Sequence, residues 1–94
     1  MSDIKYTLID NKQKNRFEFQ IGDHVAVADY QINGNIISLP HVGVPKELEG
    51  QGIASALVLA VLQNIDERKL KLVPLCPFVV TYVQRHPEWK KLLS

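Results

Sequence analysis

The hydrophobic pattern of this chain changes its period once, near residue 45, and this change limits the fold more than any other feature. Before it, apolar and polar side chains alternate, which is the pattern of strands with one buried face. After Glu49 the apolar residues follow helical spacing as far as Ile65 and cover most of the circumference, so this helix must pack on more than one side. The sequence therefore predicts an α/β chain in which strands come first and a buried helix follows.

Two-residue turns divide the first half into an antiparallel meander. Gly22-Asp23 and Asn33-Gly34 are hairpin signals, and the second is of the type I′ kind that needs positive φ at both central residues. The expected strands are a weak one over Ile4 to Ile9 that ends in the turn Asp10-Asn11-Lys12, one with the apolar set Phe17, Phe19 and Ile21, one with the apolar set Val25 and Val27 alternating with Ala26, Ala28 and Tyr30, and a long one over Asn35 to Val44.

The second half predicts a strand-helix-strand unit followed by a further helix. Leu70 to Leu75 is expected to be a short strand, parallel to the long one because a right-handed helical crossover joins them. Pro74 has no N–H to give a neighbouring strand, so the two parallel strands are expected to separate near it. A second helix is predicted from Pro77 to the pair His86-Pro87, with a final turn over Glu88 to Leu93.

Length, charge and cysteine content exclude several classes of protein. The chain has 94 residues, of which 46% are hydrophobic, so residues 1–94 are expected to form a single domain with one core. A formal charge of +1 without a basic stripe argues against a nucleic-acid partner. The longest apolar run is too short for a membrane span, and we expect no membrane partner and a cytoplasmic location. A single cysteine and three scattered histidines predict no metal site.

The junction between the long strand and the buried helix is the predicted ligand site. Two glycines at a helix start leave backbone N–H groups without partners, and the helix dipole adds partial positive charge there. Phosphate is the expected anion. The predicted binding residues are Val42, Val44, Glu49, Gly50, Gln51, Gly52, Ile53, Ala54 and Ser55.

This junction resembles the pyrophosphate loop of the GNAT superfamily of acyl-CoA-dependent N-acyltransferases, written Gln/Arg-x-x-Gly-x-Gly/Ala. Here the loop reads Glu47-Leu48-Glu49-Gly50-Gln51-Gly52, so both glycines match while Glu47 stands where the family has Gln or Arg. The run Val73 to Val79 with Tyr82 and His86-Pro87-Glu88 is similar to a small branch of single-domain GNAT-like proteins of about this length. The resemblance covers about residues 17–92.

The resemblance implies a minimal GNAT-like fold and acetyl-CoA as the co-substrate. It implies that the loop amides hold the CoA pyrophosphate and that a wedge between strand residues 42–44 and 72–75 holds the pantetheine arm. In the family a tyrosine on the following helix often protonates the departing CoA thiolate, and Tyr82 falls close to that position. The chain has no counterpart of the two helices after the first strand or of the last two strands, which commonly shape the acceptor pocket.

Three side chains are candidate catalytic groups, each with a plainer structural alternative. Cys76, at a helix start, is either an acetyl-accepting thiol or a buried packing residue. Tyr82 is either a general acid or a core aromatic with its hydroxyl at the surface. His41 is either a base that deprotonates an amine through water or a surface histidine.

Two functions of different class follow. The first is an N-acetyltransferase that passes the acetyl group of acetyl-CoA to an amine of unknown identity, by direct attack or through acetyl-Cys76. The alternative is a CoA-binding sensor or protein-interaction module that has the fold without transferase activity, which the missing acceptor elements favour.

Overall fold

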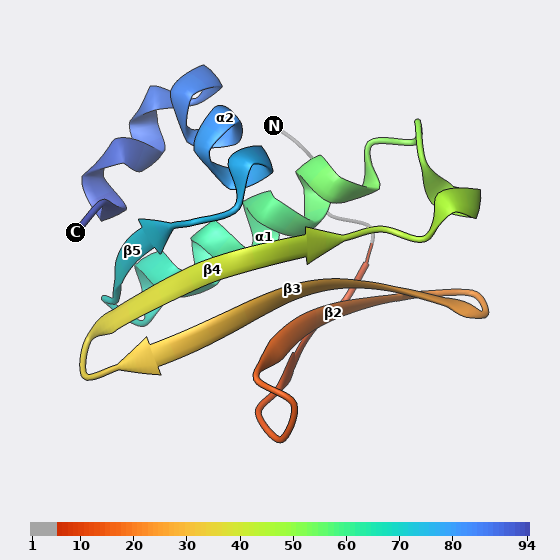
Figure 1. Ribbon diagram of the computed structural model, residues 1–94, viewed down its shortest axis with the longest axis horizontal. Coiled ribbons are helices and arrows are strands. Elements are labelled where there is room, and N and C mark those ends of the chain that lie inside the picture. Colours follow the sequence, from red (N-terminus) through yellow and green to blue (C-terminus); the bar gives the residue numbers. More distant parts are fainter. Residues whose placement is uncertain (1–5) are drawn as a thin grey trace.

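The computed structural model describes residues 6–94 as one mixed five-stranded sheet with helices packed on one of its faces (Figure 1). The order in the sheet is β1-β2-β3-β4-β5, antiparallel from β1 to β4 and parallel between β4 and β5. The strands are β1 (Leu8–Asn11), β2 (Arg16–Ile21), β3 (His24–Asn33), β4 (Ile36–Gly43) and β5 (Lys71–Pro74); the helices are α1 (Ile53–Glu67) and α2 (Pro77–Arg85), with short 3-10 helices η1 (Lys46–Leu48) and η2 (Pro87–Leu92). The predicted meander, parallel crossover and C-terminal helix are confirmed. The type I′ turn predicted at Asn33-Gly34 is wrong, because Asn33 still pairs with Ile36 and the turn is made by Gly34 and Asn35, of which only Gly34 has a positive φ.

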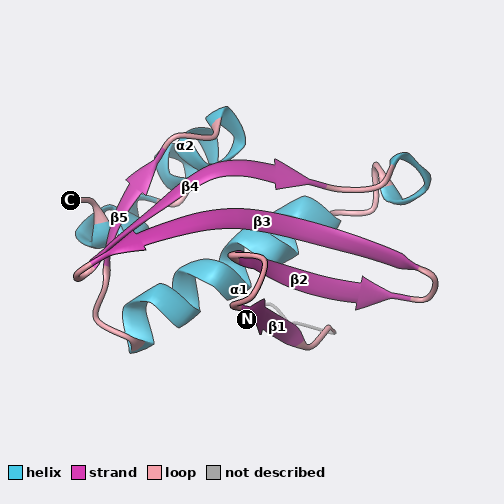
Figure 2. Cartoon of the chain, turned by 60° about the horizontal axis from the view of Figure 1, so that its bottom comes forward, coloured by secondary structure: helices cyan, strands magenta, loops and turns pink. Residues whose placement is uncertain are grey.

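Helices α1 and α2 cover one face of the sheet, called here the helix face, and leave the other, the outer face, uncovered by either helix (Figure 2). Phe17 and Phe19 of β2 are fully buried on the helix face, and α1 packs over them with Leu57, Val61 and other apolar residues. The far side of α1 packs against α2 and η2, which accounts for its wide apolar surface.

The buried face of β3 is the one that the apolar alternation did not favour. Ala26 and Ala28 lie opposite the two phenylalanines of β2 and are almost completely buried, whereas Val25 and Val27 are half-buried on the outer face. Small side chains at the centre of the sheet let α1 approach β3 closely, so space rather than hydropathy selects the face. The expectation that the valines form the buried set is wrong.

Strand β1 begins later and ends later than predicted. The expected start at Ile4 lies outside the described residues, and the strand includes Asp10 and Asn11 instead of turning at them. The hydroxyl of Tyr30 donates a hydrogen bond to Asp10, and the Asn11 side chain donates one to Glu18, which keeps both residues on the sheet. The turn follows instead, and it uses a positive φ of 54° at Asn15.

A β-bulge in β4 reverses which residues face the helices. Asp29 pairs with His41 but Gln31 pairs with Ser38, so Leu39 and Pro40 together lie opposite the single residue Tyr30. Proline suits a bulge because it has no N–H for the ladder. The extra residue shifts the alternation by one: Leu39 is buried on the helix face before the bulge, and after it Val42 takes that face, opposite the buried Ala28.

Strand β5 separates from β4 at the same place. Their last paired residues are Leu39 and Pro74, and the Leu39 carbonyl then accepts hydrogen bonds from the Leu75 and Cys76 amides at 3.2 and 2.9 Å. Strand β4 continues to Gly43 while the chain after β5 turns away into α2 (Figure 2). The predicted separation near Pro74 is therefore confirmed. Within residues 6–94 no helix is long and apolar enough to cross a membrane.

Candidate functional site

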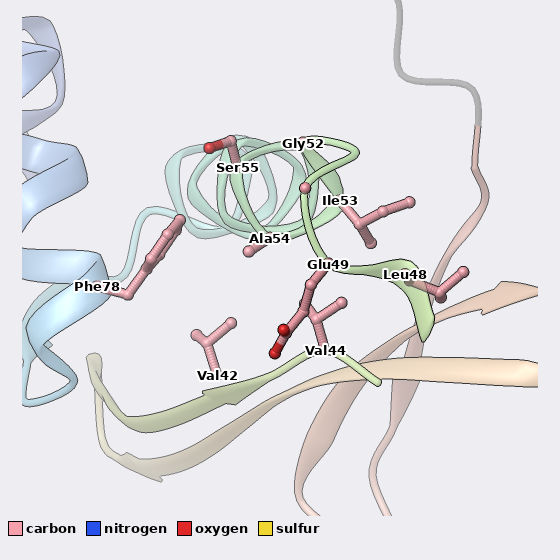
Figure 3. Close-up of a pocket in the computed structure, with 10 residues that line it drawn as sticks. Val42, Val44, Leu48, Glu49, Gly52, Ile53, Ala54, Ser55 and Phe78 are labelled. Carbon is pink, nitrogen blue, oxygen red and sulfur yellow. The ribbon is translucent and has the colours of Figure 1, made fainter. Parts of the chain in front are cut away.

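A pocket of about 340 Å³ lies where the end of β4, the following loop and the first turn of α1 meet α2; we call it the loop pocket (Figure 3). Its lining residues are Val42, Val44, Leu48, Glu49, Gly50, Gly52, Ile53, Ala54, Ser55 and Phe78. The structure brings together every predicted binding residue except Gln51. The Gln51 side chain instead donates a weak hydrogen bond of 3.5 Å to the Glu47 carbonyl and braces the loop.

The two glycines set the geometry of the loop. Gly50 and Gly52 have φ values of 83° and 76°, which are left-handed conformations that glycine adopts without steric cost. Gly52 is the N-cap of α1, and its carbonyl accepts the first helical hydrogen bond, from Ala56 at 3.0 Å. The preceding amides, up to Ser55, have no partner within the helix, and no side chain caps it. This end of the pocket can therefore hold an anion.

The wall facing this helix start is apolar. Val42 at the end of β4 and Val44 just after it point toward α1, because the bulge has turned them to that side, and Phe78 faces them from α2 (Figure 3). The sequence prediction missed Phe78 and Leu48. A signal for the former exists: Val79 and Val83 form the buried stripe of α2, and Phe78 and Tyr82 form the stripe beside it at the same spacing of four.

A carboxylate also enters the loop pocket. Glu49 is exposed, and its side chain extends along Val44 toward Val42 (Figure 3). A negative charge in this position opposes an anionic ligand at the helix start. The exposed side chain has room to rotate outward, so the carboxylate weakens anion binding without blocking it.

Tyr82 lies next to the loop pocket and not in it. Together with His86 it lines a smaller recess of about 100 Å³ that shares Ser55 and Phe78 with the loop pocket, and its ring lies 4.3 Å from the His86 ring. Burial raises the pKa of the Tyr82 hydroxyl, and the nearby Glu88 raises it further. The hydroxyl is therefore protonated at neutral pH, and it is a weaker acid than an exposed tyrosine.

Cys76 lies at the N-cap of α2, as the sequence predicts, but it belongs to the core. Its relative exposure is 7%, and its backbone amide is bound to the Leu39 carbonyl. The structure places the thiol under the start of α2 and does not bring it to the wall of the loop pocket.

His41 lies on the outer face of the sheet, opposite the loop pocket. The bulge turns its side chain away from α1, where 62% of it is exposed, and its Nδ1 lies 3.4 Å from Oδ2 of Asp29 on β3. The structure therefore separates the three candidate catalytic residues: one beside the pocket, one in the core and one on the other face.

These features can be compared with those of known proteins. The family model described as GCN5-related N-acetyl-transferase matches residues 16–92, which include β2 to β5, the glycine loop and both helices. The chain belongs to the GCN5-related N-acetyltransferase family. The resemblance seen in the glycine loop is thereby confirmed, and the loop pocket falls within the part of the chain that the family model matches.

Two relatives extend this family assignment. The mouse protein NATD1 is 28% identical over 80 residues, which are 82% of this chain and 73% of that protein. The NMR solution structure of a GCN5-like protein from Staphylococcus aureus is 25% identical and superposes with a TM-score of 0.70, covering 100% of this chain and 91% of the other. This GCN5-related fold contains no cluster of three potential metal ligands within its described residues.

Proposed function

We propose that this chain binds acetyl-CoA in the loop pocket and transfers the acetyl group to an amine. The observation that carries the proposal is the shape of the pocket: an anion-binding helix start opens onto an apolar wall beside a strand edge with unpaired backbone groups. Pyrophosphate fits the amides of residues 52–55, and pantetheine fits along residues 42–44, where the β4 backbone is free on the β5 side. The thioester then lies toward the point where the strands separate.

The transfer that we propose is direct. The amine nitrogen attacks the thioester carbonyl carbon, the new C–N bond forms, and the C–S bond breaks to release the CoA thiolate. Tyr82 supplies a proton to the thiolate, and His41 accepts the proton that the attacking amine loses, directly or through water. The burial of Cys76 supports this route over an acetyl-cysteine intermediate, which needs an accessible thiolate.

A second candidate is a CoA-binding sensor or interaction module without transferase activity. The observation that favours it is the position of His41. This candidate base and the loop pocket lie on opposite faces of the sheet. In this alternative the loop pocket binds CoA, and the outer face has no chemical role.

One experiment distinguishes these functions. Calorimetric titration with acetyl-CoA is followed by steady-state turnover with a panel that includes an N-terminal peptide, a lysine peptide, a polyamine and small primary amines. Binding with turnover supports the transferase, and binding without turnover supports the module. No binding near 1 mM acetyl-CoA rules out both. Intact mass after incubation with acetyl-CoA alone tests the covalent route, since that route requires an added acetyl group on Cys76.

A further inference from the structure

The outer face of the sheet carries a row of polar side chains that ends at His41. Cross-strand pairing places Arg16, Asp29 and His41 side by side on β2, β3 and β4. Within this row the His41 Nδ1 lies 3.4 Å from the Asp29 carboxylate. The imidazole therefore presents one nitrogen to a carboxylate and leaves Nε2 for another partner.

The arrangement of Arg16 keeps Asp29 available to the histidine. The Arg16 guanidinium lies beside Asp29 in the row but pairs with Glu18, at 2.7 Å between Nε and Oε2. Asn11 donates a further hydrogen bond to the same Glu18 carboxylate at 3.1 Å. Arg16 is thus paired with Glu18 of the same strand and not with Asp29. Among the described residues, the Asp29 carboxylate has His41 within ion-pair distance.

Gly43 provides the surface on which the imidazole rests. A Cβ atom added at Gly43 would lie 2.9 Å from His41 Cε1 and 3.6 Å from Nε2, so any larger residue must displace the ring. The backbone at this position has no positive φ, so turn geometry does not require the glycine. A glycine at residue 43 therefore permits the observed orientation of the ring.

The edge of β4 connects this ring to the loop pocket. Residues 40–43 have no partner on the β5 side, and Val42, the neighbour of His41, lines the pocket from the helix face. A group bound along the unpaired edge of residues 40–43 would therefore have Val42 on the helix face of the strand and His41 on its outer face.

We infer that Asp29 is a positioning residue for His41, holding Nδ1–H so that Nε2 points free to take the proton of the acceptor amine. The inference rests on the proposed function, because it requires transfer to an amine at this strand edge. In the step itself the amine gives its proton to Nε2 as the C–N bond forms, and the thiolate leaves with the electrons of the C–S bond. The Asp29 carboxylate, 3.4 Å from Nδ1, then lies beside the imidazolium and stabilises it.

The test compares Asp29→Asn, Asp29→Glu, His41→Gln and Gly43→Ala with the control Asp23→Asn, an exposed aspartate in the β2–β3 turn. His41→Gln is expected to lower kcat roughly 100-fold, and Asp29→Asn about 10-fold, with KM for acetyl-CoA unchanged. Asp29→Glu should recover part of the loss, and Gly43→Ala should lower kcat because its methyl group displaces the His41 ring. The double variant of Asp29 and His41 should be no slower than His41→Gln alone. Asp23→Asn should match the wild type.

A measurement independent of turnover accompanies these rates. In ¹⁵N-detected spectra of the neutral ring, wild-type His41 should carry its proton on Nδ1, and Asp29→Asn should shift the population toward Nε2–H. Equal kcat for Asp29→Asn and Asp23→Asn, or an unchanged tautomer, overturns the positioning role. Full activity of His41→Gln also overturns it, while failure of the proposed function is recognised separately by a wild type that does not bind acetyl-CoA or acetylates none of the amines.

Discussion

Replacing Gly52 by alanine tests whether the glycine loop does more than turn the chain. Gly52 has φ of 76° at the start of α1 and lines the loop pocket, and an added Cβ meets no atom within 4 Å. The structural cost of alanine is therefore conformational and not steric. A left-handed backbone costs an L-residue about 1 kcal/mol, which lowers Tm by roughly 4–8 °C in a domain of this size.

The chain offers a matched control. Gly22, in the β2–β3 turn, has φ of 59° and open space around its missing Cβ, so Gly22→Ala should lose about the same 1 kcal/mol. Its turn lies outside the loop pocket. The two variants should therefore unfold at similar temperatures without ligand, and any difference that appears with ligand reports on the pocket alone.

The decisive quantity is the stabilisation by acetyl-CoA. At a ligand concentration of 100 Kd the wild type and Gly22→Ala should each gain about 2.7 kcal/mol, a rise in Tm of roughly 10–20 °C. In Gly52→Ala the methyl group stands where a phosphate must approach the amides, and a Kd at least about 10-fold higher removes about 1.4 kcal/mol of that gain. Thermal unfolding with and without acetyl-CoA measures both effects, and equal ligand-induced shifts in the two variants would refute the assignment of this loop to the phosphates.

Four further outcomes follow from particular residues. Glu49→Gln should tighten acetyl-CoA binding about 2- to 5-fold, more at low salt, because it removes a carboxylate that faces the anion; an unchanged Kd in calorimetric titrations at two salt concentrations would show that the side chain already points away. Cys76→Ala should retain turnover and lose about 1 kcal/mol of folding stability, and loss of turnover in a folded variant would restore the covalent route. Burial and a hydrogen bond to a carboxylate raise the pKa of Tyr30 to about 12, so wild-type stability should fall as the pH rises from about 10, where the unfolded tyrosine ionises, toward 12; urea titrations of Tyr30→Phe should show a smaller decline, with the part due to Tyr82 left. Deletion of Pro40 should remove the bulge and leave Val42 opposite Ala28 on the helix face, so the variant should fold and still bind acetyl-CoA, as circular dichroism and calorimetry can show; loss of binding in a folded variant would show that the pocket needs the irregular backbone at residues 39–40.

The order of strands and helices in this chain follows from local sequence signals. Which face of each element is buried depends on tertiary packing. The hairpin signal at Gly22-Asp23 and the proline at the first position of α2 act within a few residues, so sequence alone predicts them, whereas the second turn lies one residue later than predicted. The buried face of β3 depends on how closely α1 approaches the sheet, which makes Ala28 a core residue and leaves Val27 outside. The residues of the glycine loop that line the pocket were predicted as a group because they lie close together in sequence, whereas Phe78 reaches the pocket only through the packing of α2.

Sequence periodicity does not predict the bulge at Leu39 and Pro40, although the proline stands at the position where it occurs. An uninterrupted alternation through β4 would put His41 on the same face as Ile37 and Leu39, beneath α1, and would send Val42 and Val44 to solvent. One inserted residue exchanges these two sets. The pairing with β5 ends at the same place, at Leu39 and Pro74, and leaves the β4 edge open beyond it. The apolar wall of the loop pocket and the exposed His41–Asp29 pair are thus two results of a single irregularity, and the site that we propose lies at the edge where they meet.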